Sequence, residues 1–525
     1  MMTRMNRRKF FTATTAALLA PRSSRAAEGS ATVLLKEQIG TISPLVHGHF
    51  VEHLGGVVYD GIWVGEKSKI PNIAGIRKAL IDDLKRIRAP LFRWPGGCFA
   101  DSYDWRDGVG PREKRPKRLN FWAGSEMLRK LDSHPAKYEP NEFGTNEFMR
   151  FVQEVGAKPY LAANLRGMTG REFNDWVDYC NAPLGSTTWS EVRGTAPFNV
   201  EFWGIGNESW GCGGDFRPEE YSVEFRRFTS WAPGFGVPLK FIPAGPNGGD
   251  LNWTRGFFEA LVRKSPGLLR RVWGWALHYY CGTTGGPVEF TTEEYYELLG
   301  RAVRMEQLIR DHWAIMGEYD REHRVKFAID EWGAWHKAGS EVAPHHLFGQ
   351  IGTMRDAVIA GLTLDIFHRH ADKVAMTCVA QLVNCIHSLF IAHEDKMLRT
   401  PNYHVFDLYK AHHNGVAVRA VFGAPMSGKA PRLEGSASLH EKDSRLVVTC
   451  THADAAEPLG VELRLEGGSA KSARAMVLAG APRDHNTFAE PERVKPRELR
   501  VEVRQGRLAF ELPPCSVAAL EVALG

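Results

Sequence analysis

The chain has 525 residues, with 43% hydrophobic and 24% charged residues and a formal net charge of +5. This length exceeds one ordinary domain, and the composition excludes a disordered or low-complexity chain. Basic and acidic residues are interleaved, even in the densest basic run (PREKRPKR, 111–118), so the charge does not support nucleic-acid binding.

The first 29 residues resemble a twin-arginine export signal. Residues 6–11 read NRRKFF, a short apolar run follows from Thr14 to Leu19, and Ser24-Arg25-Ala26 offers a cleavage site. We therefore expect a periplasmic or secreted protein, or a cytoplasmic one if the signal is not used. No later apolar stretch is long enough to span a bilayer, so we expect no membrane association after signal removal.

A strand-like piece at 31–43 precedes a region in which apolar runs alternate with helical segments, among them Ile73–Ile87, Thr145–Val155 and Thr292–Tyr319. Strands that alternate with helices indicate a parallel sheet, and eight repeats predict a (β/α)8 TIM barrel over 45–408. The predicted strands are Val46–Val51, Leu91–Trp94, Lys158–Asn164, Glu201–Glu208, Leu239–Ala244, Val272–Tyr280, Val325–Glu331 and Val374–Gln381.

After about Lys410 the pattern changes to short strands that are separated by turn residues, with no helix between them. This predicts a jelly-roll-like β-sandwich over 409–525. A strand from residues 30–44 is expected to complete it, so that both ends of the chain form the module. The predicted strands are Ser436–His440, Leu446–Thr449, Gly460–Leu465, Ala473–Leu478, Leu499–Val503, Leu508–Leu512 and Ser516–Val522.

The eight cysteines are scattered and form no CxxC pair. This argues against a zinc site or a dense disulfide framework, although a single disulfide stays open in an oxidising compartment. His47, His49 and His53 lie across one strand and its loop, where their side chains do not converge. We expect His49 to lie near a sugar pocket instead, and we expect no metal and no cofactor.

Two of the predicted barrel strands end in a glutamate. The fourth, EFWGIGNE (201–208), is apolar up to Asn207 and Glu208, and the seventh, VKFAIDE (325–331), ends at Glu331. Strand tips of this kind carry the catalytic residues of a parallel barrel, and cleavage of a glycosidic bond requires two carboxylates. One must keep its proton while the other stays ionised, and Arg93 at the second strand could hold the ionised one.

The sequence resembles the α-L-arabinofuranosidases of glycoside hydrolase family 51 over nearly all of the chain after the signal. The matching stretches are GHFVEHLGGVVYDGIW (48–63), FRWPGGCFADSYDWRDGVGP (92–111), FGTNEFMRFVQEVGAKPYLAANL (143–165), WGIGNE (203–208), LHYY (277–280), IDEW (329–332), HRHADKV (368–374), AQLVN (380–384) and TPNYHVFDLY (400–409).

The resemblance implies that Glu208 is the general acid/base and Glu331 the nucleophile, with carboxyl groups ~5–5.5 Å apart and retained configuration. It also implies a set of substrate-binding residues. Glu52, Asn207 and Gln381 would bind furanose hydroxyls, Tyr280 would lie beside the nucleophile, Arg93 and His278 would tune it, Cys98 would lie at the sugar's edge, and Trp335 would form a wall.

The implied activity is removal of terminal non-reducing α-L-arabinofuranosyl groups from hemicellulose or pectin fragments. The resemblance also implies a homo-oligomer, namely a hexamer. The loop from Ser209 to Gly214 (SWGCGG, where family members often have Met-Asp-Gly) is expected to set the leaving-group preference. An endoglucanase or β-xylosidase on the same barrel is the alternative. A non-catalytic carbohydrate-binding protein is disfavoured, because binding alone does not need two carboxylates in different ionisation states.

Overall fold

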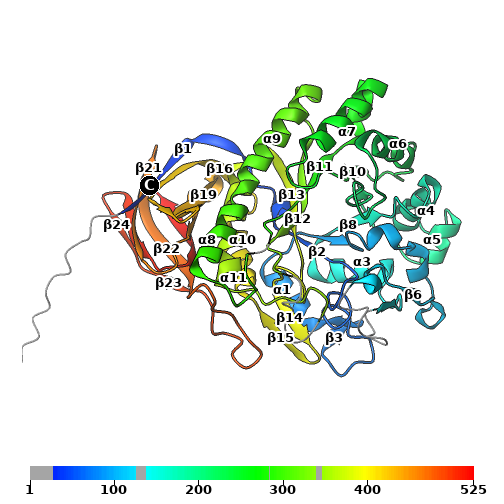
Figure 1. The fold of residues 1–525 in the computed structure, drawn as a ribbon, viewed down its shortest axis with the longest axis horizontal. Coiled ribbons are helices and arrows are strands. Elements are labelled where there is room, and N and C mark those ends of the chain that lie inside the picture. The colour runs from blue at the N-terminus through cyan, green and yellow to red at the C-terminus, as the bar shows by residue number, and fades with distance from the viewer. Residues whose placement is uncertain (1–27, 126–136, 283, 338–345) are drawn as a thin grey trace, which may run out of the picture.

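The larger part of the molecule is built around a ring of eight parallel strands (Figure 1). The computed structural model describes residues 28–125, 137–282, 284–337 and 346–525, so residues 1–27 of the predicted export signal lie outside it. The strands are β2 (Gly48–Phe50), β5 (Leu91–Trp94), β8 (Lys158–Ala163), β9 (Phe202–Ile205), β10 (Lys240–Pro243), β11 (Gly274–Tyr280), β12 (Lys326–Gly333) and β13 (Val374–Val379).

The strands pair in chain order, and β13 returns to pair with β2. Between β10 and β11 the ring closes through a Phe241–Val272 bridge and a 2.9 Å bond from Trp273 N–H to Phe241 C=O. The predicted (β/α)8 barrel is therefore confirmed. Alternate side chains of the strands point inward, and Phe50, Tyr160 and Phe202 belong to a small apolar cluster that fills the barrel.

Helices surround the barrel: α1 (Lys78–Arg86), α3 (Thr145–Val155), α4 (Gly170–Asn181), α5 (Thr188–Arg193), α6 (Pro218–Thr229), α7 (Leu251–Lys264), α8 (Thr292–Ala302), α9 (Arg304–Tyr319), α10 (Met354–Arg369) and α11 (Pro401–Tyr409). Two boundaries differ from the prediction. The helix expected from Ile73 begins at Lys78, because a hairpin turns through Ala74 and Gly75, both at positive φ. The long helix expected at 292–319 is broken into α8 and α9 at Val303.

The second unit is a ten-stranded, mostly antiparallel sheet with its own apolar core. In Figure 1 the blue strand β1 (Gly29–Thr41) lies among the yellow-to-red strands, since it pairs with β16 (Val416–Gly423) and β21 (Leu459–Glu466). Strand β16 was not predicted. The region expected as one strand at 499–503 is two, β23 and β24. The other strands are β19 (Leu433–His440), β20 (Arg445–His452), β22 (Ala470–Ala479), β23 (Arg497–Leu499), β24 (Val501–Arg504), β25 (Arg507–Leu512) and β26 (Ser516–Leu524).

Helix α10 joins the two units through a buried carboxylate. Asp365 accepts hydrogen bonds from the hydroxyls of Ser436 (2.8 Å), Thr449 (2.6 Å) and Thr451 (3.0 Å) on the sheet. A buried charge with this many donors is stable, whereas one without partners would be costly. Among the residues that the structure describes, no helix is long and apolar enough to cross a membrane.

Candidate active site

Glu208 lies in a strained turn immediately after β9. Its φ is +40°, and Gly206 two residues earlier has a φ of +76°, a value that favours glycine. The carboxylate of Asp101 holds this turn, because it accepts hydrogen bonds from the backbone N–H groups of Asn207 (2.8 Å) and Leu165 (2.7 Å). Strain of this kind persists where the surroundings fix it, and it is common at functional sites. Sequence reasoning did not single out Asp101.

Glu331 lies at the end of β12 and is held by two donors. Arg93 Nη1 donates to Oε1 at 2.7 Å, and the Tyr280 hydroxyl donates to Oε2 at 2.8 Å. Arg93 Nη2 also donates to Asn207 Oδ1 at 2.6 Å, so one guanidinium orients both residues. Gly97 leaves the room for this arrangement, because a Cβ there would lie 2.7 Å from Glu331 Oε1.

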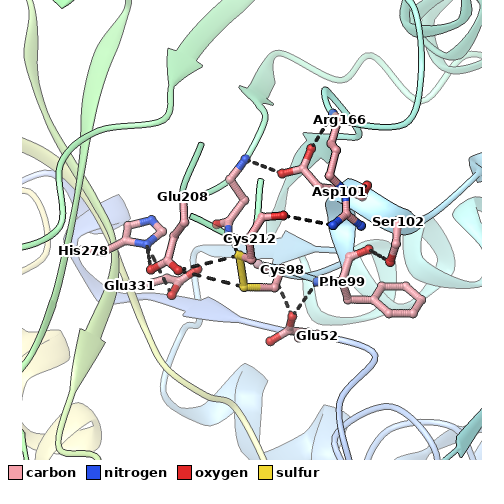
Figure 2. The surroundings of a disulfide bond; sticks show 12 residues. Glu52, Cys98, Phe99, Asp101, Ser102, Arg166, Glu208, Cys212, His278 and Glu331 are labelled. Carbon is pink, nitrogen blue, oxygen red and sulfur yellow. Dashed lines mark hydrogen bonds and ion pairs between the residues drawn. A yellow bond between two sulfur atoms is a disulfide. The ribbon is translucent and has the colours of Figure 1, made fainter. Parts of the chain in front are cut away.

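His278 connects the two glutamates (Figure 2). Its Nδ1 lies 3.0 Å from Glu208 Oε1 and 3.4 Å from Glu331 Oε2. One oxygen of each carboxylate and this ring nitrogen all lie within 4.8 Å of one another. The structure therefore brings the two predicted catalytic residues together beside Nδ1 of one imidazole.

Asp330 is a site residue that the sequence analysis missed. Its buried carboxylate lies 3.1 Å from His278 Nε2 and 3.2 Å from Arg93 Nε, and it accepts a 2.8 Å bond from the Tyr160 hydroxyl. In a regular strand Asp330 and Glu331 would point to opposite faces. The pairing of β12 with β13 is irregular between Ile329 and Trp332, which lets both carboxylates reach the site.

The charges of this cluster depend on one another. Burial opposes charge on His278, but Glu331, Asp330 and Glu208 outweigh it and raise the pKa of His278 to about 10. Burial also disfavours the charge of Asp330, yet Arg93 and His278 lower its pKa to about 2. Burial raises the pKa of Glu331, an effect that His278 and Arg93 oppose. His278 is thus a cation at neutral pH that faces both glutamates.

Glu52 lies against the loop that carries Cys98. Its Oε1 accepts bonds from the N–H groups of Gly97 and Phe99, each at 3.1 Å, and its Oε2 accepts from Gln381 Nε2 at 3.0 Å. Burial and the charge of Glu331 raise the pKa of Glu52 to about 7. A carboxyl group of this kind can donate or accept toward a sugar hydroxyl near neutral pH.

The disulfide that cysteine spacing left open joins Cys98 to Cys212. Figure 2 shows it beside Glu208, whose Oε2 lies 3.9 Å from Cys98 Sγ and 3.8 Å from Cys212 Sγ. The bond links the loop after β5 to the loop after β9, across 114 residues of sequence. Cys98 therefore lies at the edge of the site as half of a disulfide.

Trp335 lies in a row of aromatic rings that begins at Tyr280. Ring centroids are 5.2 Å apart for Tyr280 and Trp335, 5.1 Å for Trp335 and Phe348, and 5.6 Å for Phe348 and Trp122. This row begins beside Glu331 and offers an apolar surface of the kind that sugar faces pack against.

His49 does not lie near the pocket, so that expectation is wrong. Its ring packs beside Phe92 and Phe406 at centroid distances of 5.7 and 5.3 Å, and burial lowers its pKa to about 3. Strand alternation explains this position, because Phe50 points into the barrel and its neighbour His49 must therefore point outward.

The cluster of Glu208, His278 and Glu331 has ligand atoms close enough for a metal ion. A protonated imidazole has no lone pair to give, however, and Arg93 and Tyr280 already donate to both oxygens of Glu331. The arrangement fits proton transfer and nucleophilic attack better than metal binding.

Comparison with known proteins agrees with this geometry. Residues 83–232 match the family model described as alpha-L-arabinofuranosidase 1 domain, and residues 330–516 match the alpha-L-arabinofuranosidase C-terminal domain. An intracellular exo-alpha-L-arabinofuranosidase of Bacteroides ovatus is 34% identical over 96% of this chain and 98% of its own. The chain belongs to the α-L-arabinofuranosidases of glycoside hydrolase family 51.

Two further relatives of this family 51 enzyme are informative. The crystal structure of the family 51 arabinofuranosidase of Xanthomonas axonopodis pv. citri superposes with a TM-score of 0.87 at 33% identity, and covers 94% of this chain and 100% of its own. An intracellular exo-alpha-(1->5)-L-arabinofuranosidase of Streptomyces lividans is 28% identical over 91% of this chain and 73% of its own. The protein is therefore a glycoside hydrolase of a family that retains anomeric configuration.

Proposed function

We propose that this family 51 enzyme removes terminal non-reducing α-L-arabinofuranosyl groups from hemicellulose or pectin oligosaccharides, with Glu331 as nucleophile and Glu208 as general acid/base. The observation that carries this proposal is the position of the two carboxylates, which have an oxygen each within 4.8 Å of one another. Retaining glycosidases hold their carboxyl groups about 5–5.5 Å apart, whereas inverting ones leave room for a water.

In the first step Glu331 attacks the anomeric carbon and forms an ester with the arabinofuranosyl group, while Glu208 gives its proton to the departing oxygen. Arg93 and Tyr280 aim the two oxygens of Glu331 and, with His278, stabilise its charge before attack. In the second step Glu208 takes a proton from water, the water oxygen bonds to the anomeric carbon, and Glu331 leaves as a carboxylate.

The side chains that we propose to bind the sugar hydroxyls are Glu52, Asn207 and Gln381. Gln381 donates to Glu52 through Nε2, and its buried Oε1 has no hydrogen-bond partner among the described residues. Asn207 accepts from Arg93 through Oδ1 and donates from Nδ2 to Cys212 Sγ at 3.8 Å, so one of its two amide N–H groups is left for a sugar hydroxyl. Because buried polar groups without partners are costly, a substrate hydroxyl at Gln381 would both bind and stabilise the site.

The loop from Ser209 to Gly214 is proposed to contact the leaving group. It follows Glu208 directly, and the disulfide at Cys212 attaches it to the loop that carries Cys98. A backbone bond of 3.2 Å from Gly213 N–H to Glu208 C=O keeps it folded over the acid/base. The rigid loop and Trp335 would then limit which aglycones reach Glu208.

Turnover of 4-nitrophenyl α-L-arabinofuranoside beside the matching β-xyloside and a soluble β-glucan tests the proposal. We expect the arabinofuranoside to be by far the best substrate and the first product to keep its anomeric configuration in proton NMR. Preference for the xyloside or the glucan would replace this proposal with the β-xylosidase or endoglucanase alternative. Turnover of none of the three would contradict the proposed activity.

We also propose that the enzyme is exported. The paired arginines and apolar run before residue 28 support this, as does the Cys98–Cys212 disulfide, because disulfides persist in oxidising compartments. Two named relatives are intracellular, so a cytoplasmic enzyme is the competing outcome. Cell fractionation with a thiol count decides, since an exported enzyme should show six reactive thiols of eight after unfolding without reductant.

We also propose that the enzyme forms the hexamer that the family resemblance implies. Light scattering on the purified enzyme should give a mass six times the 58.7 kDa chain, less any signal removed. A monomer or dimer at assay concentration would contradict it.

A further inference from the structure

A second cluster of ligand-type side chains lies outside the active site. It consists of Asp60, His346 and His393, which come from the turns after β2, the segment after β12, and strand β14 (Phe390–His393). One atom of each lies within 4.8 Å of the other two. Asp60 Oδ2 is 3.3 Å from His346 Nε2 and 2.9 Å from His393 Nδ1.

The two oxygens of Asp60 have different surroundings. Oδ1 accepts a 2.9 Å bond from the N–H of Glu394 and lies 3.6 Å from Arg77 Nη2. Oδ2 is left to face the two imidazoles. Donors on the outer oxygen fix the orientation of a carboxylate ligand, as outer-shell partners do in metal sites.

The distances also suit a small tetrahedral ion. Zinc bonds to imidazole nitrogen and carboxylate oxygen at roughly 2.0–2.2 Å, which places neighbouring ligand atoms about 3.3 Å apart. The separation of Asp60 Oδ2 from His346 Nε2 has this value, and that from His393 Nδ1 is slightly shorter. The side chain of His393 is 48% exposed, so an ion could enter there and keep water as its fourth ligand.

We propose that Asp60, His346 and His393 bind a zinc ion. Two imidazoles and one carboxylate favour Zn²⁺ and related transition metals over Mg²⁺ or Ca²⁺, which prefer oxygen ligands. The proposal does not depend on the roles assigned to Glu208 and Glu331.

The ion would fasten a segment that lies beside the active site. The His346 ring packs against Gly56, since a Cβ added at Gly56 would lie only 2.5 Å from the ring. The backbone carbonyl of Leu347 is similarly close to Gly55, where an added Cβ would lie 2.7 Å from the carbonyl oxygen. Phe348, two residues further on, supports Trp335. Zinc at His346 would therefore hold this segment, and through it the aromatic row, against the turn that follows β2.

The test is a titration of the chelator-treated full-length enzyme with zinc sulfate, followed by calorimetry and thermal melting. We expect one equivalent to bind per chain, to raise the melting temperature and to slow proteolysis around His346. Cobalt(II) in its place should give the visible absorption of a tetrahedral site. Magnesium chloride should have none of these effects.

Matched variants locate the ion. His393→Gln and Asp60→Asn should weaken zinc binding by more than the roughly 10–100-fold that loss of an outer-shell partner costs. His485→Gln is the control, since that partly exposed histidine bonds to the carbonyl of Arg483 and lies outside the cluster. Unchanged affinity in His393→Gln and Asp60→Asn, loss of binding in Glu208→Gln, or no zinc binding by the unaltered enzyme would overturn the proposal.

Discussion

Replacement of Asp330 by asparagine tests the idea that this buried carboxylate keeps His278 charged. The substitution preserves size but removes the charge that lies 3.1 Å from His278 Nε2. A hydrogen bond to a charged group contributes about 1.5–3 kcal/mol, and one pKa unit corresponds to about 1.36 kcal/mol. The pKa of His278 should therefore fall by about 1–2 units from its value of about 10.

Stability should change with pH in a defined direction. The folded state raises the pKa of His278 from 6.5 to about 10, so its contribution is full below pH 6.5 and is lost as the pH rises toward 10. In Asp330→Asn the stability should depend less on pH. The free energy of unfolding should also fall by about 3 kcal/mol, the lower end of the cost of breaking a buried ion pair, because Arg93 still has Glu331 as a partner.

The assay is NMR titration of the His278 ring, together with urea unfolding between pH 6 and 10. Tyr160→Phe is the control, since it removes a bond to Asp330 without changing its charge, and it should shift the His278 pKa far less. An unchanged His278 pKa in a folded Asp330→Asn variant would show that Asp330 does not keep His278 charged.

Three further variants probe other contacts. Glu52→Gln should raise KM, yet it should increase stability above pH 7. The folded state raises the pKa of this carboxyl from 4.5 to about 7 and so disfavours its ionisation, a cost that glutamine does not have. A loss of stability at pH 8 would contradict this expectation. Joint replacement of Cys98 and Cys212 by serine should lower the free energy of unfolding by about 3–5 kcal/mol, because the disulfide closes a long loop, and it should also lower kcat/KM. An unchanged melting temperature would show that the disulfide does not stabilise the fold. Gly97→Ala should lower kcat at least tenfold, a barrier increase of about 1.4 kcal/mol, because the added Cβ would lie 2.7 Å from Glu331 Oε1. The melting temperature should change little, and full activity would mean that the neighbouring residues shift to accommodate the methyl group.

The positions at the strand ends were predictable because one rule governs them. Parallel strands of a barrel present their carboxyl ends at one face, so residues such as Glu208, Glu331 and Gln381 converge although they are far apart in the chain. The structure brings them together as this rule requires.

Other features were not predictable, for separate physical reasons. Alternation along β12 hides Asp330, which reaches the site only because the pairing there is irregular. The Cys98–Cys212 bond depends on the positions of two loops that sequence spacing does not encode. His49 was misplaced because the sequence of a strand as short as β2 does not show which of its side chains point into the barrel. The structure shows that Phe50 does, so His49 points outward.

Capture of the glycosyl-enzyme tests whether Glu331 is the nucleophile and Glu208 the acid/base. In Glu208→Ala, a substrate with a good leaving group needs no acid for the first step but lacks the base for the second. We expect intact mass spectrometry to show one added pentosyl group and peptide mapping to place it on Glu331. An adduct on another residue, or rapid turnover without any adduct, would contradict the assignment of the two glutamates.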